Sequence, residues 1–142
     1  MNTSQKLRYT LSTKPRQRVH GCLNWYNILN IDLTDCWGIR LRKGKKLLGQ
    51  IFVEFAETPK KQLTAWLFCF AINPLYRENG YGTMLLKKAE EFIAKNSDAE
   101  IVLLHAQKES EDTLIPFYEK RGYQKAQRDP QCNDEYVLWK EL

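Results

Sequence analysis

The sequence predicts an α/β domain built on a mixed, partly antiparallel sheet flanked by helices. Apolar and polar residues alternate along residues 6–11, 37–42 and 47–55, which is typical of half-buried strands. Residues 63–72 are apolar on both faces, as in a central strand that is covered on both sides. Segments with helical spacing separate only some of these strands. This order favours a mixed sheet over a doubly wound parallel one.

The composition fits a single domain over residues 1–142. A chain of 142 residues that is 43% hydrophobic can bury one core and has no room for a second domain. The N-terminus has no apolar signal-peptide region, and no apolar run approaches the roughly 18 to 20 residues of a membrane span. We therefore expect no membrane partner and a cytoplasmic location.

The four cysteines predict neither a metal site nor a disulfide framework. They are scattered along the chain without a C-x-x-C pair, which is the usual spacing of zinc ligands. They are Cys22, Cys36, Cys69 and Cys132.

The net charge suits an anionic partner. There are 22 Lys and Arg against 17 Asp and Glu, giving a formal charge of +5. Both a phosphate-bearing cofactor and nucleic acid are compatible with this balance. The densest basic cluster, residues 40–46, has no interleaved aromatic residues, which is more typical of a solvated hairpin tip than of a nucleic-acid surface. Nucleic acid is therefore disfavoured as a partner.

The N-terminal third is expected to hold a strand, a helix and a hairpin. Thr13 resembles an N-cap and Pro15 fits a first helical turn, so the helix is predicted from Thr13 to about Asn30. Residues 31–36 are polar and predict a connection. The following strands meet at a turn containing Gly44, which predicts a hairpin.

Proline and glycine positions place the elements of the C-terminal half. Pro116 is tolerated only in a first turn, so the last helix is predicted to start after Thr113 and to end before Gly122. The other expected elements are a strand at 63–72, a helix from about Gly80, a strand at 100–107, and strands at 123–127 and 135–141.

Residues 66–93 predict an anion-binding site. An apolar strand leads through Arg77-Glu78-Asn79-Gly80-Tyr81-Gly82 directly into an amphipathic helix. The glycines let a ligand approach the backbone, and the first N–H groups of the helix lack intrahelical acceptors. Together with the helix dipole, these groups favour a phosphate or pyrophosphate.

Two motifs resemble those of the GNAT superfamily of acyl-CoA-dependent N-acyltransferases. The first is Arg77-x-x-Gly80-x-Gly82 after a strand, and the second is Phe117-Tyr118-Glu119-Lys120-Arg121-Gly122-Tyr123 after the next strand. The resemblance covers about residues 47–127. It implies a three-layer sandwich with a splayed, largely antiparallel sheet. It also implies direct acetyl transfer from acetyl-CoA to a primary amine, on a small molecule or a peptide, and it allows a homodimer.

The resemblance assigns the donor site. The loop backbone and the first helical turn would hold the coenzyme A pyrophosphate, with Arg77 as a nearby cation. The pantetheine arm would lie along the end of the preceding strand, hydrogen-bonded like an added strand. The residues implied are Phe70, Ala71, Ile72, Arg77, Glu78, Asn79, Gly80, Tyr81, Gly82 and Thr83.

Tyr118 is the expected acid, while the base has two candidates. A phenol can donate a proton or a hydrogen bond to the departing thiolate, although an aromatic side chain here could also be simple core packing. An amine that arrives protonated needs a base, and Glu54 and His105 on neighbouring strands are the candidates. Their structural alternatives are a solvated sheet residue and a hydrogen-bonded core histidine.

The acceptor side is less defined. Glu111 and Glu135 stand where many relatives of this type have Asn and His. A non-catalytic acyl-CoA-binding or protein-interaction module on the same fold is therefore the main alternative, and a basic nucleic-acid-binding domain is the third. The first connection and the last hairpin hold carboxylates that could either attract a cationic amine or be ordinary solvated loop acids: Asp32, Asp35, Asp129, Asp134 and Glu135.

Overall fold

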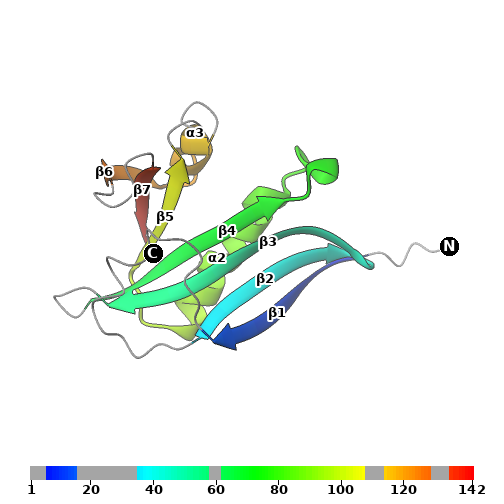
Figure 1. Cartoon of the computed structure of the whole chain (residues 1–142), viewed down its shortest axis with the longest axis horizontal. Helices are drawn as coiled ribbons and strands as arrows, with labels where there is room; N and C mark the ends of the chain where they lie inside the picture. The colour runs from blue at the N-terminus through cyan, green and yellow to red at the C-terminus, as the bar shows by residue number, and fades with distance from the viewer. Residues whose placement is uncertain (1–5, 16–34, 58–61, 108–113, 129–134) are drawn as a thin grey trace.

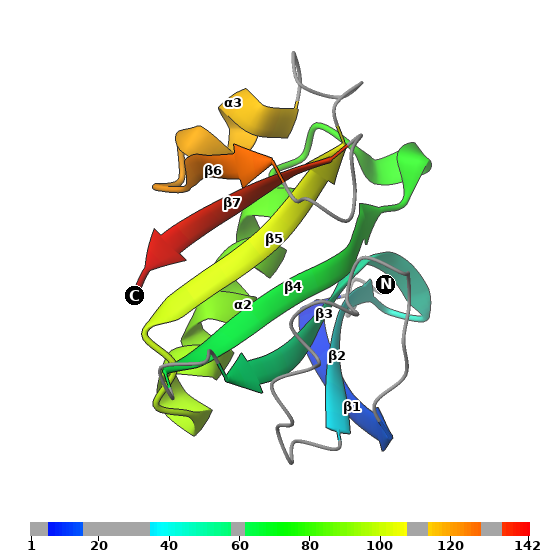
Figure 2. The ribbon, with the colours of Figure 1, turned by 60° about the vertical axis from the view of Figure 1, so that its left-hand side comes forward.

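The computed structural model describes residues 6–15, 35–57, 62–107, 114–128 and 135–142. These residues form one seven-stranded sheet in the order β1-β2-β3-β4-β5-β7-β6, with helices packed against it (Figures 1 and 2). The strands are β1 Leu7–Pro15, β2 Asp35–Lys43, β3 Lys46–Glu57, β4 Leu63–Ile72, β5 Ile101–Gln107, β6 Gln124–Arg128 and β7 Glu135–Glu141. The helices are the 3-10 turn η2 Pro74–Tyr76, α2 Tyr81–Asn96 and α3 Leu114–Glu119.

The predicted α/β class and the mixed, largely antiparallel sheet are confirmed. Among the described strands, β4 and β5 form the parallel pair, and the other neighbouring strands are antiparallel. The predicted central strand 63–72 is β4, which lies fourth of seven in the sheet. The strand predicted at 135–141 is β7, and the helix predicted from about Gly80 is α2.

The sheet forks between β4 and β5. The two strands pair only over Thr64–Leu67 and Ile101–Leu104, although β4 continues to Ile72 and β5 to Gln107. Figure 1 shows the two arrows diverging toward their carboxyl ends. Beyond Leu67, β4 no longer pairs with β5. A strand end that has parted from its neighbour is a place where an extended ligand can add to the sheet.

The core lies between the sheet and α2. Leu85, Leu86, Ala89 and Ile93 form the buried stripe of the helix, and Phe92 beside it is half-buried. Fully burying a leucine or isoleucine side chain contributes about 1.5 to 3 kcal/mol. This stripe therefore fixes α2, and its N-terminus, against the sheet. No helix in the described part of the chain is long and apolar enough to cross a membrane.

The predicted helix at 13–30 is wrong at its start. Thr13, Lys14 and Pro15 continue β1 and pair with residues 35–37 of β2. Proline lacks an N–H group, but β1 is an edge strand, where a proline at the strand end is tolerated. The rest of that predicted helix lies outside the described residues. The predicted connection 31–36 also ends early, because Asp35 and Cys36 belong to β2.

A bulge changes the alternation of β4. Phe52 of β3 is opposite Phe68, whereas Gln50 is opposite Ala71, so β4 has one extra residue between these pairs. Cys69 takes up the irregularity with a φ of 49°, which is unusual for a residue other than glycine. A shift of one residue moves every later side chain to the other face. After the bulge, Phe70 and Ile72 therefore pack on the helix side of the sheet, while Ala71 is exposed.

Candidate active site

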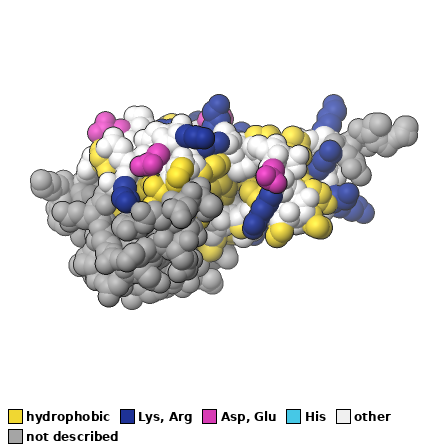
Figure 3. Space-filling view, turned by 90° about the horizontal axis from the view of Figure 1, so that it is seen from above, with side chains coloured by type: hydrophobic (Ala, Val, Ile, Leu, Met, Phe, Trp, Pro, Cys, Tyr) yellow, Lys and Arg dark blue, Asp and Glu magenta, His cyan; other side chains and the backbone are white. Residues whose placement is uncertain are grey.

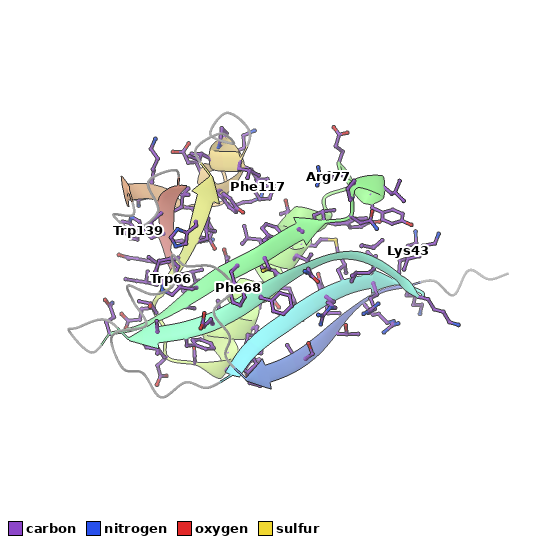
Figure 4. The ribbon with its side chains drawn as sticks, in the orientation of Figure 1. Lys43, Trp66, Phe68, Arg77, Phe117 and Trp139 are labelled. Atoms are coloured by element: carbon purple, nitrogen blue, oxygen red, sulfur yellow. The ribbon has the colours of Figure 1, made fainter. Side chains whose placement is uncertain are left out.

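A cavity of about 910 Å³ lies where the end of β4, the start of α2 and α3 meet. Figure 4 shows Arg77 in the loop after β4 and Phe117 on α3, on two sides of this region. Its lining combines aromatic side chains with the glycine-containing loop. The lining residues are Phe70, Ala71, Ile72, Tyr76, Arg77, Glu78, Gly80, Tyr81, Gly82, Thr83, Leu114, Phe117, Tyr118 and Arg121.

One end of the cavity is suited to an anion. Gly80 is the N-cap of α2 and has a φ of 81°, a conformation that glycine adopts readily. The Met84 N–H donates to the Gly80 carbonyl (3.1 Å), so the preceding helical N–H groups have no acceptor within the helix. The first turn contains no acidic residue. Free N–H groups and the positive end of the helix dipole therefore lie at the cavity wall.

Tyr118 lies at the aromatic end of the cavity. Its side chain is 6% exposed and contacts three aromatic rings, Phe117, Tyr123 and Phe70, at centroid distances of 5.3, 5.9 and 6.4 Å. Burial raises the pKa of Tyr118 to about 12. The phenol is therefore uncharged near neutral pH and can donate a hydrogen bond into the cavity.

The raised pKa of Tyr118 predicts a loss of stability in alkali. The unfolded chain releases this proton near pH 10 and the folded protein near pH 12. The stability that the neutral Tyr118 phenol contributes to the folded state is complete below about pH 10. It is lost by roughly 1.4 kcal/mol per pH unit as pH rises from about 10 to about 12. Denaturant unfolding at pH 9 and pH 11 should show the wild type losing about 1 kcal/mol more than Tyr118→Phe. Equal losses would contradict a buried, neutral phenol.

Arg121 joins the two ends of the cavity, and the sequence did not single it out as a site residue. It donates to the Thr83 hydroxyl through Nε (3.1 Å) and Nη2 (2.6 Å), and to the Phe117 carbonyl through Nη1 (2.7 Å). Its guanidinium also lies 3.8 Å from the centre of the Phe117 ring. It therefore ties α3 to the first turn of α2 and adds a cation to the cavity wall. Its position in the second motif, directly before Gly122, is the sequence feature that could have identified it as a site residue.

A second set of contacts ties the segment after α3 to α2. The Tyr123 hydroxyl donates to Glu90 (2.8 Å), and Lys140 of β7 binds the other oxygen of the same carboxylate (3.0 Å). Burial, followed by the adjacent Glu90 carboxylate, raises the pKa of Tyr123. Because Tyr123 packs against Tyr118, these contacts also hold the Tyr118 ring in place.

The structure brings most of the predicted site residues together. Of the residues predicted to bind the donor, all line the cavity except Asn79, and Tyr118 lines it as well. The Asn79 side chain instead donates to the carbonyls of Tyr76 (2.9 Å) and Arg77 (3.1 Å), which shapes the loop. Besides Arg121, the sequence did not assign three lining residues to the site: Tyr76, Leu114 and Phe117.

The two candidate bases do not line this cavity. Glu54 is 1% exposed and is opposite Trp66 in the sheet, and the Trp66 ring stacks on His105 at 5.2 Å. Strand alternation places these three side chains on the face opposite α2. A solvated sheet residue was the alternative role predicted for Glu54 from the sequence, and its burial shows that this alternative is wrong. His105 directly follows Leu104, the last residue of β5 that pairs with β4.

Several residues expected at the acceptor side cannot be placed. Asp32, Glu111, Asp129 and Asp134 lie outside the described residues. Asp35 begins β2 and Glu135 begins β7. The described residues contain no group of three or more His, Cys, Asp or Glu side chains that could hold a metal ion.

The basic hairpin lies next to the loop that precedes α2. The Asn73 side chain donates to the Leu47 carbonyl (3.3 Å), and its backbone N–H donates to that of Leu48 (2.7 Å). Figure 3 shows Lys and Arg side chains gathered at the right-hand end of the molecule, which holds the β2–β3 turn in Figure 1. Arg40 instead packs over the Phe52 ring (5.3 Å) and donates to Ser12 (2.8 Å), so it belongs to the sheet surface.

Comparisons with known proteins agree with this geometry. A model of the acetyltransferase (GNAT) family matches residues 6–123. A comparison with curated protein sequences found no match. Among solved structures, Arabidopsis thaliana NAA60 in complex with a bisubstrate analogue has a TM-score of 0.66 at 12% identity, over 94% of this chain and 99% of that one.

Two further structures share the fold. A Bacillus subtilis acetyltransferase in complex with CoA has a TM-score of 0.63 at 18% identity, over 96% of this chain and 99% of that one. Arabidopsis thaliana Naa50 in complex with the bisubstrate analogue CoA-Ac-MVNAL has a TM-score of 0.61 at 17% identity, over 93% and 99%. At these identities the likeness shows the fold alone.

Proposed function

Since the chain belongs to the GNAT acetyltransferase family, we propose that it is an N-acetyltransferase that moves an acetyl group from acetyl-CoA directly to a primary amine. The observation that carries this proposal is the single cavity that joins the N-terminus of α2 to the buried phenol of Tyr118. An anion site and a hydrogen-bond donor at its two ends match a long ligand with a diphosphate and a reactive thioester.

The donor end is formed by α2 and the loop before it. The N–H groups around Gly80, Gly82 and Thr83 bind the diphosphate, and Arg77 and Arg121 supply positive charge on either side. The end of β4, where it has parted from β5, offers backbone groups of Phe70, Ala71 and Ile72 to the amides of the pantetheine arm. When bound, acetyl-CoA supplies the activated acetyl group as a thioester.

Tyr118 assists departure of the thiolate. As the C–N bond forms and the C–S bond breaks, negative charge collects on sulfur. A thiol has an ordinary pKa of about 8.5, well below the value of about 12 for Tyr118, so complete proton transfer from the phenol is uphill. Tyr118 therefore acts mainly by donating a hydrogen bond to sulfur as it leaves.

We assign the base to His105. Its side chain is on the face opposite α2, and it lies at the fork of β4 and β5, where an amine could approach from the side away from the donor. Glu54 lies on β3, one strand further from the fork. An imidazole also accepts protons near neutral pH, as removal of a proton from an alkylammonium requires.

The pH dependence of kcat/KM tests the base. We expect His105→Gln to lower kcat/KM by about a hundredfold, the low end of the range for general-base catalysis, and to remove the acidic limb of the pH profile. Trp66→Phe serves as the control, because it alters the ring stacked on His105 but retains the imidazole. A profile that keeps its acidic limb in His105→Gln and loses it in Glu54→Gln would assign the base to Glu54.

The proposed activity is tested by two measurements on the full chain. Acetyl-CoA should raise the melting temperature, and thiol release should appear with at least one member of an amine panel. The panel should begin with peptides bearing a free amino terminus, since Naa50 was solved with a peptide-based bisubstrate analogue, and continue with polyamines, aminoglycosides and amino acids. Stabilisation without turnover would support the non-catalytic binding module, and absence of both would overturn the proposal.

A further inference from the structure

The face of the sheet opposite α2 carries a cluster of arginines on β1 and β2. Tyr9 of β1 and Ile39 of β2 pack on the α2 side. Because successive side chains alternate between the two faces of a strand, Arg8, Arg40 and Arg42 lie on the other face. This face is turned toward the viewer in Figure 1, where α2 lies behind β3 and β4. The three arginines therefore share one surface on neighbouring strands.

One row of this face leads from the arginines to the donor cavity. Arg40 is opposite Gln50 in the pairing of β2 with β3, and Gln50 is opposite Ala71 in the pairing of β3 with β4. Ala71 is exposed on this face beyond the bulge and also lines the cavity. Neighbouring strands lie about 4.8 Å apart, so the backbone of Arg40 is about 10 Å from that of Ala71. An acceptor that approaches on this face can therefore reach both.

The arginines have neutral partners on this surface. The Arg40 guanidinium donates to the Ser12 hydroxyl (2.8 Å). The Arg8 guanidinium donates to the Gly44 carbonyl (2.9 Å). Among the residues that the structure describes, none of the three arginines forms a salt bridge. Arg8 is directly opposite Arg42 in the ladder, an arrangement of like charges that destabilises a sheet and that a bound anion would relieve.

A carboxylate on an extended ligand suits this cluster. Guanidinium groups are planar forks that bind a carboxylate through two parallel hydrogen bonds. The carboxylate of Glu54 is on the same face, but it is buried and lies four residues beyond Gln50, about 13 Å along β3. The distance of about 10 Å between the arginines and the cavity corresponds to about three residues of extended peptide. In a free amino acid, by contrast, a single carbon atom joins the amine to the carboxylate.

We propose that Arg40 and Arg42 bind a carboxylate side chain of the acceptor, and that the acceptor is a peptide with an acidic residue close to its free amino terminus. The inference rests on the proposed function and names the acceptor class for it. The amine lies at the fork between β4 and β5, where His105 accepts its proton, and the peptide crosses β4 and β3 toward the arginines. Arg8 adds positive charge beside Arg42.

Three peptides that differ only in their third residue test this acceptor class. We expect the wild type to acetylate the glutamate peptide with a kcat/KM about tenfold above that of the glutamine peptide, the effect of a hydrogen bond to a charged group, and further above that of the lysine peptide. In the Arg40→Gln/Arg42→Gln variant, kcat/KM for the glutamate peptide should fall about tenfold. The glutamine peptide and the Kd for acetyl-CoA should stay within about twofold, which also shows that the variant is folded.

The matched control is Lys45→Gln/Lys46→Gln, which removes the same charge from the neighbouring tip of the β2–β3 hairpin. It should keep the preference for the glutamate peptide within about twofold of the wild-type preference. An equal loss of preference in both double variants would overturn the arginine site in favour of general electrostatic attraction. Equal kcat/KM for the three peptides in the wild type, or turnover of other amines but of no peptide, would overturn the inference and leave the proposed acetyltransferase in place. Absence of thiol release with every amine would overturn both.

Discussion

Replacing Tyr118 by phenylalanine is expected to lower kcat about a hundredfold while changing the Kd for acetyl-CoA by no more than about twofold. The substitution keeps the ring and its contacts with Phe70, Phe117 and Tyr123. It removes only the hydroxyl, which carries the hydrogen bond to the departing sulfur. General acids and hydrogen-bond donors of this kind contribute about 10² to 10⁴ in rate. Because the contact forms as the C–S bond breaks, the loss should appear in kcat and not in donor binding.

The neighbouring tyrosine provides the control. Tyr123→Phe removes an equivalent hydroxyl 5.9 Å away in ring-centroid distance, but that hydroxyl is bonded to Glu90 and does not line the cavity. It should reduce stability by about 1 to 3 kcal/mol through the lost bond to a charged group, with a much smaller effect on kcat than Tyr118→Phe. Full activity in Tyr118→Phe, with stability unchanged near neutral pH, would show that Tyr118 is a packing residue only.

Gly49→Ala is expected to lower the free energy of unfolding by about 2 to 3 kcal/mol. A Cβ atom on Gly49 would lie 2.5 Å from Ile72 Cδ1, 2.8 Å from the Ala71 carbonyl oxygen and 2.9 Å from Leu85 Cδ1. The carbonyl belongs to the backbone of β4 and cannot swing away as a side chain can. Relief therefore requires β3 and β4 to separate beside the donor cavity, so donor affinity should fall as well.

Gly82→Ala is the matched control for stability. The same methyl group would meet Phe117, Phe70 and Ile72 at 3.5 to 3.8 Å, which are ordinary contact distances. Alanine also favours the helical conformation over glycine by up to about 1 kcal/mol, so stability should hold or rise slightly. Denaturant unfolding of both variants makes the comparison. A Gly49→Ala protein as stable as the wild type would show that β3 and β4 approach less closely than the structure indicates.

The sequence predicted those elements that local pattern and turn chemistry determine. Strand 63–72 was identified from its apolar run. Pro116 and Gly122 predicted a last helix that ends at residue 121, and the observed helix α3 spans Leu114–Glu119. The loop around Gly80 was identified because a strand that leads through glycines directly into a helix places N–H groups without intrahelical acceptors beside a backbone that a ligand can approach. These features depend on neighbours within a few residues, which is the range over which one sequence is informative.

Other features depend on partners distant in the sequence. Pro15 suits a first helical turn equally well, and only its pairing with Asp35 at the sheet edge makes it part of β1. A bulge can be recognised in a sequence only where it interrupts an alternation of apolar and polar residues. β4 is apolar on both faces around Cys69, so the direction in which Phe70 points could not be predicted. Arg121 belongs to the site because it donates a hydrogen bond to Thr83, 38 residues earlier in the chain. No spacing rule predicts a contact between residues so far apart.

The fork in the sheet allows a bound ligand to take the place of a strand beside β4. The carboxyl ends of β4 and β5 diverge and leave main-chain groups that neither strand satisfies for the other. A bound donor would complete that ladder, as a substitute strand. By mass action, a donor at a hundred times its Kd would add about 2.7 kcal/mol to the stability of the fold. Because the contacts argued for the donor involve its diphosphate and pantetheine arm, free coenzyme A would stabilise the fold in the same way as acetyl-CoA.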